Sequence, residues 1–218
     1  MSAEARALMA NARQLGVALL PGAASQLFAL LDELSQWNRA YNLTAIRERG
    51  AMVRAHLLDS LAAVPDLAGE RILDVGTGAG FPGLPLAMAS PGRHFTLIDS
   101  VAKKIRFVTH ACRRLALTNV NAVQARVQSL APTLAFDTIV ARAYAPLPAL
   151  LTDVQHLVGP DTRIVALKGQ YPHEELAALP AGWQLEQVRT PEIPGLDATR
   201  HILTLVYTPV VPPRQRLD

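Results

Sequence analysis

Three glycines alternate with other residues in the stretch RILDVGTGAGFPGLPLA, which runs from Arg71 to Ala87. The stretch begins with a short apolar run containing Asp74, and Gly76, Gly78 and Gly80 follow at once. A loop of this kind lets a ligand approach the backbone closely, because glycine has no Cβ and tolerates positive φ. The candidate ligands are a nucleoside triphosphate, a dinucleotide and a different nucleoside cofactor.

The residues after the loop exclude a nucleoside triphosphate. A phosphate-binding Walker loop ends in Gly-Lys-Ser/Thr, whereas Gly83 is followed here by leucine and proline. The same residues leave a dinucleotide open, because Gly78, Gly80 and Gly83 match G-x-G-x-x-G and Asp99 follows at about the distance of a ribose-binding acid. An NAD-dependent oxidoreductase therefore remains an alternative.

Two features of the loop oppose a dinucleotide. Asp74 lies within the end of the apolar run, where a pyrophosphate gains nothing from a carboxylate. Pro82 and Pro85 remove backbone N–H donors from the start of the following helix, where a pyrophosphate would bind. A cationic cofactor without phosphates suits this loop better. S-adenosylmethionine is such a cofactor, and D-V-G-x-G-x-G is its usual loop.

Polar residues also close three later apolar runs. Asp99 closes FTLID, Arg142 closes FDTIVAR, and Lys168 closes RIVALK. Ligands of open α/β sheets bind beyond the carboxyl ends of the strands, so we expect all three side chains near the glycine loop. Asp99 would accept hydrogen bonds from the cofactor ribose. Arg142 could hold a carboxylate of the cofactor, a phosphate, or the O6 edge of a guanine base if the partner is a nucleic acid. The alternatives are a helix N-cap for Asp99 and a structural role for each of the two cations.

The segment 101–117 separates into an apolar and a basic face. Its apolar positions recur at helical spacing: Val101, Ile105, Val108, Cys112 and Leu115. Its basic positions form a stripe: Lys103, Arg106, His110 and Arg113. Because basic stripes bind phosphates without sequence preference, we predict RNA contacts for Lys103, Arg106 and Arg113, with Lys168 as a further contact. The alternative is a solvated helix face.

The elements that must position these residues alternate along the chain. Apolar residues recur at helical spacing in residues 3–64, and seven short apolar runs follow. We expect strands at 71–75, 94–99, 120–123, 136–142, 163–169, 183–188 and 201–207, with helices near 82–90, 101–117, 146–158 and 172–179. This alternation predicts a mostly parallel sheet with right-handed crossovers and helices on both faces. The last two runs lack a helix between them and predict an antiparallel pair at one edge.

Composition and charge narrow the class of protein. The chain has 218 residues and a net charge of +3, but residues 71–134 carry eight Lys/Arg and only two Asp/Glu. This basic middle predicts an anionic partner, with a solvated surface as the alternative. The single Cys112 excludes an internal disulfide and a multi-cysteine metal site. No apolar run reaches the roughly 18 residues of a membrane span, and we find no signal-peptide core. We expect a cytoplasmic protein without a metal.

Seven segments together resemble one family. They are WNRAYNLTAI, HLLDSL, ILDVGTGAGFPGLPLA, FTLIDSVAKKIRFV, FDTIVARA, ALKGQ and RHIL, in this order between about Trp37 and Tyr207. In these segments the chain is similar to the ribosomal RNA small subunit methyltransferase G family, also called glucose-inhibited division protein B. The resemblance implies a Rossmann-like class I S-adenosylmethionine-dependent methyltransferase with an N-terminal helical cap (1–66), a cofactor-binding domain (67–210) and a C-terminal tail (211–218).

The resemblance also implies an activity, which is methylation of N7 of one guanine in 16S ribosomal RNA near the decoding site. It implies cofactor contacts at Gly76, Phe81, Val127, Gln128 and Arg142, to which the glycine loop adds Thr77, Gly78, Gly80 and, as the ribose acceptor, Asp99. Many members of the family have an acidic residue in place of Gln128, and an amide oxygen can still accept from the adenine amine. The partner is the small-subunit RNA or the small subunit itself. A non-catalytic RNA-binding assembly factor is the remaining alternative.

Methylation of guanine N7 does not require a side chain that takes up a proton. Guanine N7 has a free lone pair and no proton, so its methylation needs no general base and rests on alignment and electrostatics. We expect Arg142 to be the catalytic residue. His56, Asp59 and Ser60 resemble a hydrolytic trio, but their spacing on one helix favours capping or packing. A helix ends and a turn starts at Asn38, Tyr41, Asn42 and Thr44, and we expect these residues to position the N-terminal cap against the cofactor pocket.

Overall fold

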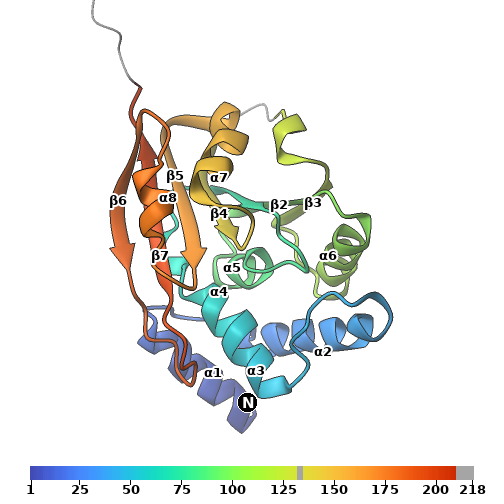
Figure 1. Cartoon of the computed structure of the whole chain (residues 1–218). Helices are drawn as coiled ribbons and strands as arrows, with labels where there is room; N and C mark the ends of the chain where they lie inside the picture. The colour runs from blue at the N-terminus through green and yellow to red at the C-terminus, as the bar shows by residue number, and fades with distance from the viewer. Residues whose placement is uncertain (132–134, 210–218) are drawn as a thin grey trace, which may run out of the picture.

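A computed structural model describes residues 1–131 and 135–209 (Figure 1). The expected tail, residues 211–218, lies outside the described residues. The helices are α1 (Ala3–Gln14), α2 (Ala23–Tyr41), α3 (Arg49–Met52), α4 (Asp59–Leu61), α5 (Gly83–Ala89), α6 (Ala102–Arg114), α7 (Leu147–Val154) and α8 (His173–Ala177). The strands are β1 (Arg71–Val75), β2 (His94–Asp99), β3 (Val120–Gln124), β4 (Phe136–Arg142), β5 (Val158–Lys168), β6 (Trp183–Arg189) and β7 (His201–Tyr207).

The seven strands form one sheet in the order β3-β2-β1-β4-β5-β7-β6. The first five pair in parallel, and β7 pairs antiparallel with both β5 and β6. Strand order reverses between β1 and β4, and ligands of open α/β sheets bind at such a switch point, beyond the carboxyl ends of the strands. The glycine loop after β1 and the end of β4 therefore lie where a ligand is expected.

Consecutive side chains of each strand point to opposite faces of the sheet and enter two different cores. Ile72 of β1 packs in one core with residues of α1, α2, α5 and α6, and Leu73 packs in the other with residues of α7. Both side chains have no exposed surface. The sheet is therefore covered on both faces, as its nearly continuous apolar strands require.

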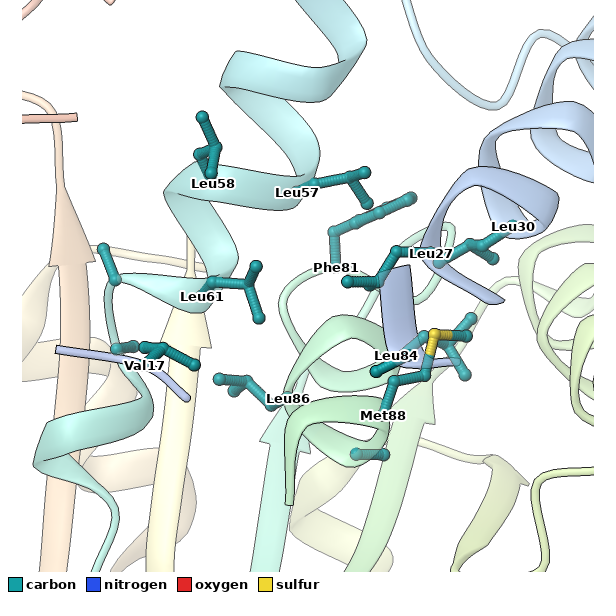
Figure 2. Close-up of a cluster of buried hydrophobic side chains, with 14 of the residues drawn as sticks. Val17, Leu27, Leu30, Leu57, Leu58, Leu61, Phe81, Leu84, Leu86 and Met88 are labelled. Carbon is teal, nitrogen blue, oxygen red and sulfur yellow. The ribbon is translucent and has the colours of Figure 1, made fainter. Parts of the chain in front are cut away.

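The N-terminal helices cover the face that also carries α5 and α6, and they lie below the sheet in Figure 1. α3, the π-helical segment Val53–Leu58 and α4 follow one another without a break in helical backbone. Figure 2 shows Leu27 of α2, Leu57 of the π-helical segment and Phe81 of the glycine loop gathered in one apolar cluster. The helices before the sheet thus pack directly on the glycine loop.

Most elements confirm the predictions, with two corrections. The last two strands do form an antiparallel pair, and β6 is the edge strand. β5 begins at Val158 rather than residue 163, because its irregular pairing with β4 carries the strand through a Gly-Pro-Asp sequence that resembles a turn. Val101 was predicted on the apolar face of its helix, which is wrong: it caps the start of α6 and is 38% exposed. Among the described residues no helix is long and apolar enough to cross a membrane.

Candidate functional site

Three adjoining cavities lie at the carboxyl ends of the strands. The β2 cavity, of about 270 Å³, is lined by residues that include Gly76, Ile98, Asp99, Lys104, Val127, Gln128 and Tyr144. The loop cavity, of about 230 Å³, is lined by residues that include Thr44, His56, Thr77, Gly78, Phe81 and Arg142. The β5 cavity, of about 460 Å³, is lined by residues that include Ala55, His56, Asp59, Arg142, Lys168 and Arg200.

The cavities share residues, which makes them one groove. Gly76 and Lys104 line both the β2 and the loop cavity. His56 and Arg142 line both the loop and the β5 cavity. Ala143 lines all three and has a φ of 53°, an unusual backbone conformation for alanine. A bound molecule can therefore extend from the end of β2, past the glycine loop, to the end of β5.

The buried side chain of Asp74 holds the glycine loop through hydrogen bonds. Its side chain is fully buried, and Oδ2 accepts hydrogen bonds from Thr77 Oγ1 at 2.6 Å and from the Gly83 N–H at 2.8 Å. Burial raises the pKa of Asp74 to about 6, although these hydrogen bonds and Arg142 act in the opposite direction. Asp74 lines none of the three cavities, so it shapes the loop rather than contacting the ligand.

The three loop glycines have different roles. All three have positive φ. A Cβ on Gly80 would lie 2.3 Å from Leu84 Cδ1, and a Cβ on Gly76 would lie 2.5 Å from Tyr144 Cδ2. A Cβ on Gly78 would meet nothing closer than 3.9 Å and would stand in the loop cavity. Gly78 therefore keeps space open for a ligand, whereas Gly80 is a packing residue that lines no part of the groove.

Asp99 lies at the junction of loop and sheet. Its Oδ1 accepts from the Val101 N–H at 2.9 Å, and its Oδ2 accepts from the Gly78 N–H at 3.1 Å. Lys104 also donates to Oδ2, at 3.1 Å. The carboxylate is thus held at the floor of the β2 cavity, with its side chain only 6% exposed. Its hydrogen bond to Val101 shows that it both caps the turn before α6 and faces the cavity.

The turn after β3 and the segment after β4 supply a further wall of the β2 cavity. Val127 is buried, and Gln128 is exposed at the edge of the cavity. Tyr144 packs beside Gly76 and donates from its hydroxyl to Asp153 Oδ2 at 2.7 Å. Burial and Asp153 raise the pKa of Tyr144 to about 12, so its hydroxyl stays protonated at neutral pH. This wall combines an aliphatic side chain, an aromatic ring and an amide, which suits a flat heterocyclic base.

Arg142 ends β4, as predicted, but its partner comes from the N-terminal helices. Its Nη1 donates to Asp59 Oδ2 at 2.9 Å and to the Ala55 carbonyl at 3.0 Å. The other oxygen of Asp59 accepts from Arg200 Nε at 2.7 Å. One buried carboxylate therefore orients two guanidinium groups at the rim of the β5 cavity, and the interactions of Asp59 exclude a hydrolytic trio.

His56 forms the boundary between the loop and β5 cavities. Its ring stacks on Phe81, with ring centres 4.7 Å apart, and its Nε2 lies 3.0 Å from Thr44 Oγ1. Asn38 holds the segment that carries Thr44, because its amide donates to the Thr44 carbonyl at 2.9 Å. Burial lowers the pKa of His56 to about 4, with help from the charge of Arg142, so the imidazole is neutral at pH 7. The turn and the N-terminal helices therefore reach the loop cavity through Thr44 and His56, and their role at a cofactor pocket stays a prediction.

The predicted RNA contacts lie in different places. Lys168 lines the β5 cavity and pairs with Glu175 at 2.7 Å. Lys103 donates to the Tyr41 carbonyl at 3.1 Å, and the Arg106 guanidinium lies over the Tyr41 ring. Both therefore lie against Tyr41, the last residue of α2. Arg113 lines a separate hollow beside β3 and is not brought together with them.

Four groove residues were not singled out as ligand contacts by the sequence: Lys104, Tyr144, His56 and Arg200. Arg200 is 141 residues from Asp59, its partner, and no local pattern connects the two. Tyr144 follows a strand end by two residues and carried the clearest signal of the four, since functional residues gather at strand ends.

The groove fits S-adenosylmethionine on the features described. Gly78 leaves a cradle that a Cβ would fill, Asp99 places a carboxylate, the acceptor that a ribose requires, on the β2 cavity, and the Val127 wall suits adenine. Among residues 1–131 and 135–209, no group of three or more His, Cys, Asp or Glu could hold a metal ion.

The strand order, the glycine loop after β1 and the acid closing β2 define a class I S-adenosylmethionine-dependent methyltransferase. Two solved structures share this fold. Magnesium protoporphyrin IX methyltransferase from Synechocystis aligns with a TM-score of 0.57 at 16% identity, covering 80% of this chain and 91% of that one. A SAM-dependent methyltransferase from Aquifex aeolicus aligns with a TM-score of 0.52 at 18% identity, covering 72% of this chain and 93% of that one.

Sequence similarity identifies the family within this class. Residues 23–203 match the family described as rRNA small subunit methyltransferase G. The ribosomal RNA small subunit methyltransferase G of Idiomarina loihiensis is 46% identical over 180 residues, which are 83% of this chain and 87% of that protein. The protein of the same name from Erwinia tasmaniensis is 42% identical over 198 residues, covering 91% and 97%. The chain belongs to the rRNA small subunit methyltransferase G family, and this membership excludes the NAD-dependent alternative.

Proposed function

We propose that this protein transfers the methyl group of S-adenosylmethionine to N7 of a guanine in small-subunit ribosomal RNA. The cofactor occupies the β2 and loop cavities, and the guanine enters the β5 cavity. The observation that carries the proposal is the position of Arg142, which lines both the loop and the β5 cavity. The relatives named above supply the substrate class, because each is named a ribosomal RNA small subunit methyltransferase.

The polar groups of the β5 cavity match guanine better than adenine. Lys168 and Arg200 are donors that suit the guanine O6 acceptor, and the same donors would oppose the adenine 6-amino group. Each Asp59 oxygen accepts a hydrogen bond from one arginine and keeps a lone pair that can accept a second hydrogen bond, from a base N–H. For N7 to react, the donors must bind O6 while leaving N7 free.

The residues around the transfer point align the reactants without taking a proton. The lone pair of guanine N7 forms the new bond to the methyl carbon, while the carbon–sulfur bond of S-adenosylmethionine breaks and its electron pair stays on sulfur. No proton moves, so no general base is needed. Asp59 offsets the charge of Arg142, and His56 is neutral at pH 7. These residues therefore add little positive charge beside the sulfonium that reacts.

The test combines purified protein, methyl-labelled S-adenosylmethionine and small ribosomal subunits that lack the modification. The proposal predicts label in one guanine of the 16S RNA, released as 7-methylguanosine on nuclease digestion. Naked 16S RNA forms a parallel arm and shows whether the substrate is free RNA or the assembled subunit. Absence of transfer to both substrates, with RNA binding intact, would identify a non-catalytic RNA-binding factor instead.

A further inference from the structure

Lys104 occupies the centre of the groove, where the β2 and loop cavities meet. The residues that line both of these cavities are Gly76, Lys104 and Ala143, and of these Lys104 alone has a long side chain. Its ammonium is 3.1 Å from Asp99 Oδ2. Its side chain is 34% exposed, so it can move toward solvent without disturbing the apolar core.

The hydrogen bonds of Asp99 leave too few acceptor sites for a ribose while Lys104 is bound. A carboxylate offers about four lone-pair sites. The Val101 and Gly78 N–H groups use two of them and fix the carboxylate in place. Lys104 uses a third, which leaves about one site for the two hydroxyl groups of a ribose. Both hydroxyls can donate to Asp99 only when Lys104 has moved away.

Charge repulsion also opposes cofactor binding while Lys104 is paired with Asp99. S-adenosylmethionine carries a sulfonium and an ammonium beside one carboxylate, so its net charge is positive. An ammonium at the junction of the two cavities repels these charges, and it loses its own counter-ion when the ribose takes Asp99. The released Lys104 still lines the loop cavity, which shares His56 and Arg142 with the β5 cavity that the RNA enters.

We propose that Lys104 closes the cofactor groove in the free protein and binds an RNA phosphate once the cofactor has displaced it from Asp99. The inference rests on the proposed function for the identity of the anion. Lys104 then couples the two substrates: cofactor binding adds one phosphate contact, and RNA binding in turn strengthens cofactor binding by the same factor, as thermodynamic linkage requires. Lys104 is a positioning residue and takes no part in the transfer itself.

The first experiment measures cofactor affinity without RNA, by calorimetry on the full chain. Lys104→Met removes the competing ion pair, and we expect it to bind S-adenosylmethionine roughly two- to fivefold more tightly than wild type. The gain should be smaller for S-adenosylhomocysteine, which lacks the sulfonium charge. Lys103→Met is the matched control, because Lys103 lines neither cavity, and its cofactor affinity should equal that of wild type. Weaker cofactor binding by Lys104→Met would make Lys104 a cofactor ligand and overturn the proposal.

The second experiment measures the salt dependence of 16S RNA binding with and without S-adenosylhomocysteine. One additional phosphate contact steepens the slope of log Kd against log[salt] by roughly 0.7–0.9. Wild type and Lys104→Arg should show this change when the cofactor product is present, and Lys104→Met should show equal slopes in both conditions. If wild type binds RNA with the same salt slope with and without S-adenosylhomocysteine, the proposed coupling through Lys104 is wrong, while the proposed function stands. Failure of wild type to bind RNA would overturn the proposed function together with it.

Discussion

Nη1 of Arg142 lies 2.9 Å from Oδ2 of Asp59, and this ion pair joins the end of β4 to the helices that precede the sheet. The two residues are 83 positions apart in the chain. Arg200, the residue immediately before β7, binds the second oxygen of the same carboxylate. The N-terminal helices therefore do more than cover one face of the sheet. They supply the anion that orients both arginines at the rim of the β5 cavity.

Replacing Arg142 with lysine tests what its guanidinium binds. If Arg142 holds the cofactor carboxylate, Arg142→Lys should raise the cofactor Kd, because an ammonium cannot reproduce a two-pronged guanidinium contact. If it binds the O6 edge of guanine instead, cofactor affinity should persist while turnover falls. Calorimetry and single-turnover methyl transfer separate the two results, and we expect the first to dominate. An Arg142→Ala variant with wild-type affinity and turnover would refute both roles.

Gly78 and Gly80 should respond differently to substitution. Gly78→Val places a side chain in the loop cavity, so we expect cofactor affinity to fall below detection, with a stability cost of about 1–2 kcal/mol for positive φ. Gly80→Ala brings a Cβ against Leu84, so stability should fall by more than this. Urea denaturation and calorimetry measure the two effects. Unchanged cofactor affinity in Gly78→Val would contradict the assignment of the loop.

Asp74 should make stability depend on pH in an unusual direction. Its pKa is raised to about 6 by burial, so the protonated side chain favours the folded state. This contribution is fully present below the unfolded pKa near 4 and is lost as pH rises through about 6. The shift corresponds to about 3 kcal/mol. Relative to wild type, Asp74→Asn should therefore gain about 3 kcal/mol between pH 4 and pH 7. Denaturation curves with a constant difference across this range would contradict the prediction.

His56 should make folding stability rise with pH, opposite to Asp74, over the same pH range. Its pKa is lowered to about 4 by burial, so stability is fully present above pH 6.5 and is lost as pH falls through about 4. The shift again corresponds to about 3 kcal/mol. His56→Phe keeps an aromatic ring on Phe81 but removes the titration, so its stability relative to wild type should rise by this amount as pH falls from 7 to 4. Because the pH dependences from Asp74 and His56 nearly cancel, the stability of wild type should change little between pH 4 and pH 7. Parallel plots of stability against pH for His56→Phe and wild type would contradict the assignment to His56.

The fold followed from the sequence because each strand is a short apolar run with local boundaries. Six of the seven strands start and end within one residue of the prediction. The exceptions have local causes. The start of β5 contains Gly-Pro-Asp, which resembles a turn but here lies in irregular pairing with β4. Val101 continues the apolar spacing of α6, yet Asp99 binds its N–H and the helix begins only after it.

The site followed from the sequence only in part. The residues at strand ends, Asp99, Arg142 and Lys168, line the groove because parallel strands bring their carboxyl ends to one edge. Gly80 was expected at the cofactor but packs on Leu84, because spacing alone does not distinguish a ligand cradle from a tight contact. The partnership of Asp59 with Arg142 and Arg200 depends on tertiary packing of distant segments, which no local pattern encodes.

Replacing N7 of the target guanine with carbon tests whether that atom receives the methyl group. Small-subunit RNA is prepared with 7-deazaguanine, in which a carbon replaces N7, at the guanine that the mapping experiment identifies. The RNA is incubated with S-adenosylmethionine and the protein, and its nucleosides are measured by mass spectrometry. We expect one 7-methylguanosine per unmodified RNA and no methylation of the 7-deaza RNA at equal RNA affinity. Methylation of the 7-deaza RNA at the same nucleotide would show that another atom is the acceptor and contradict the account.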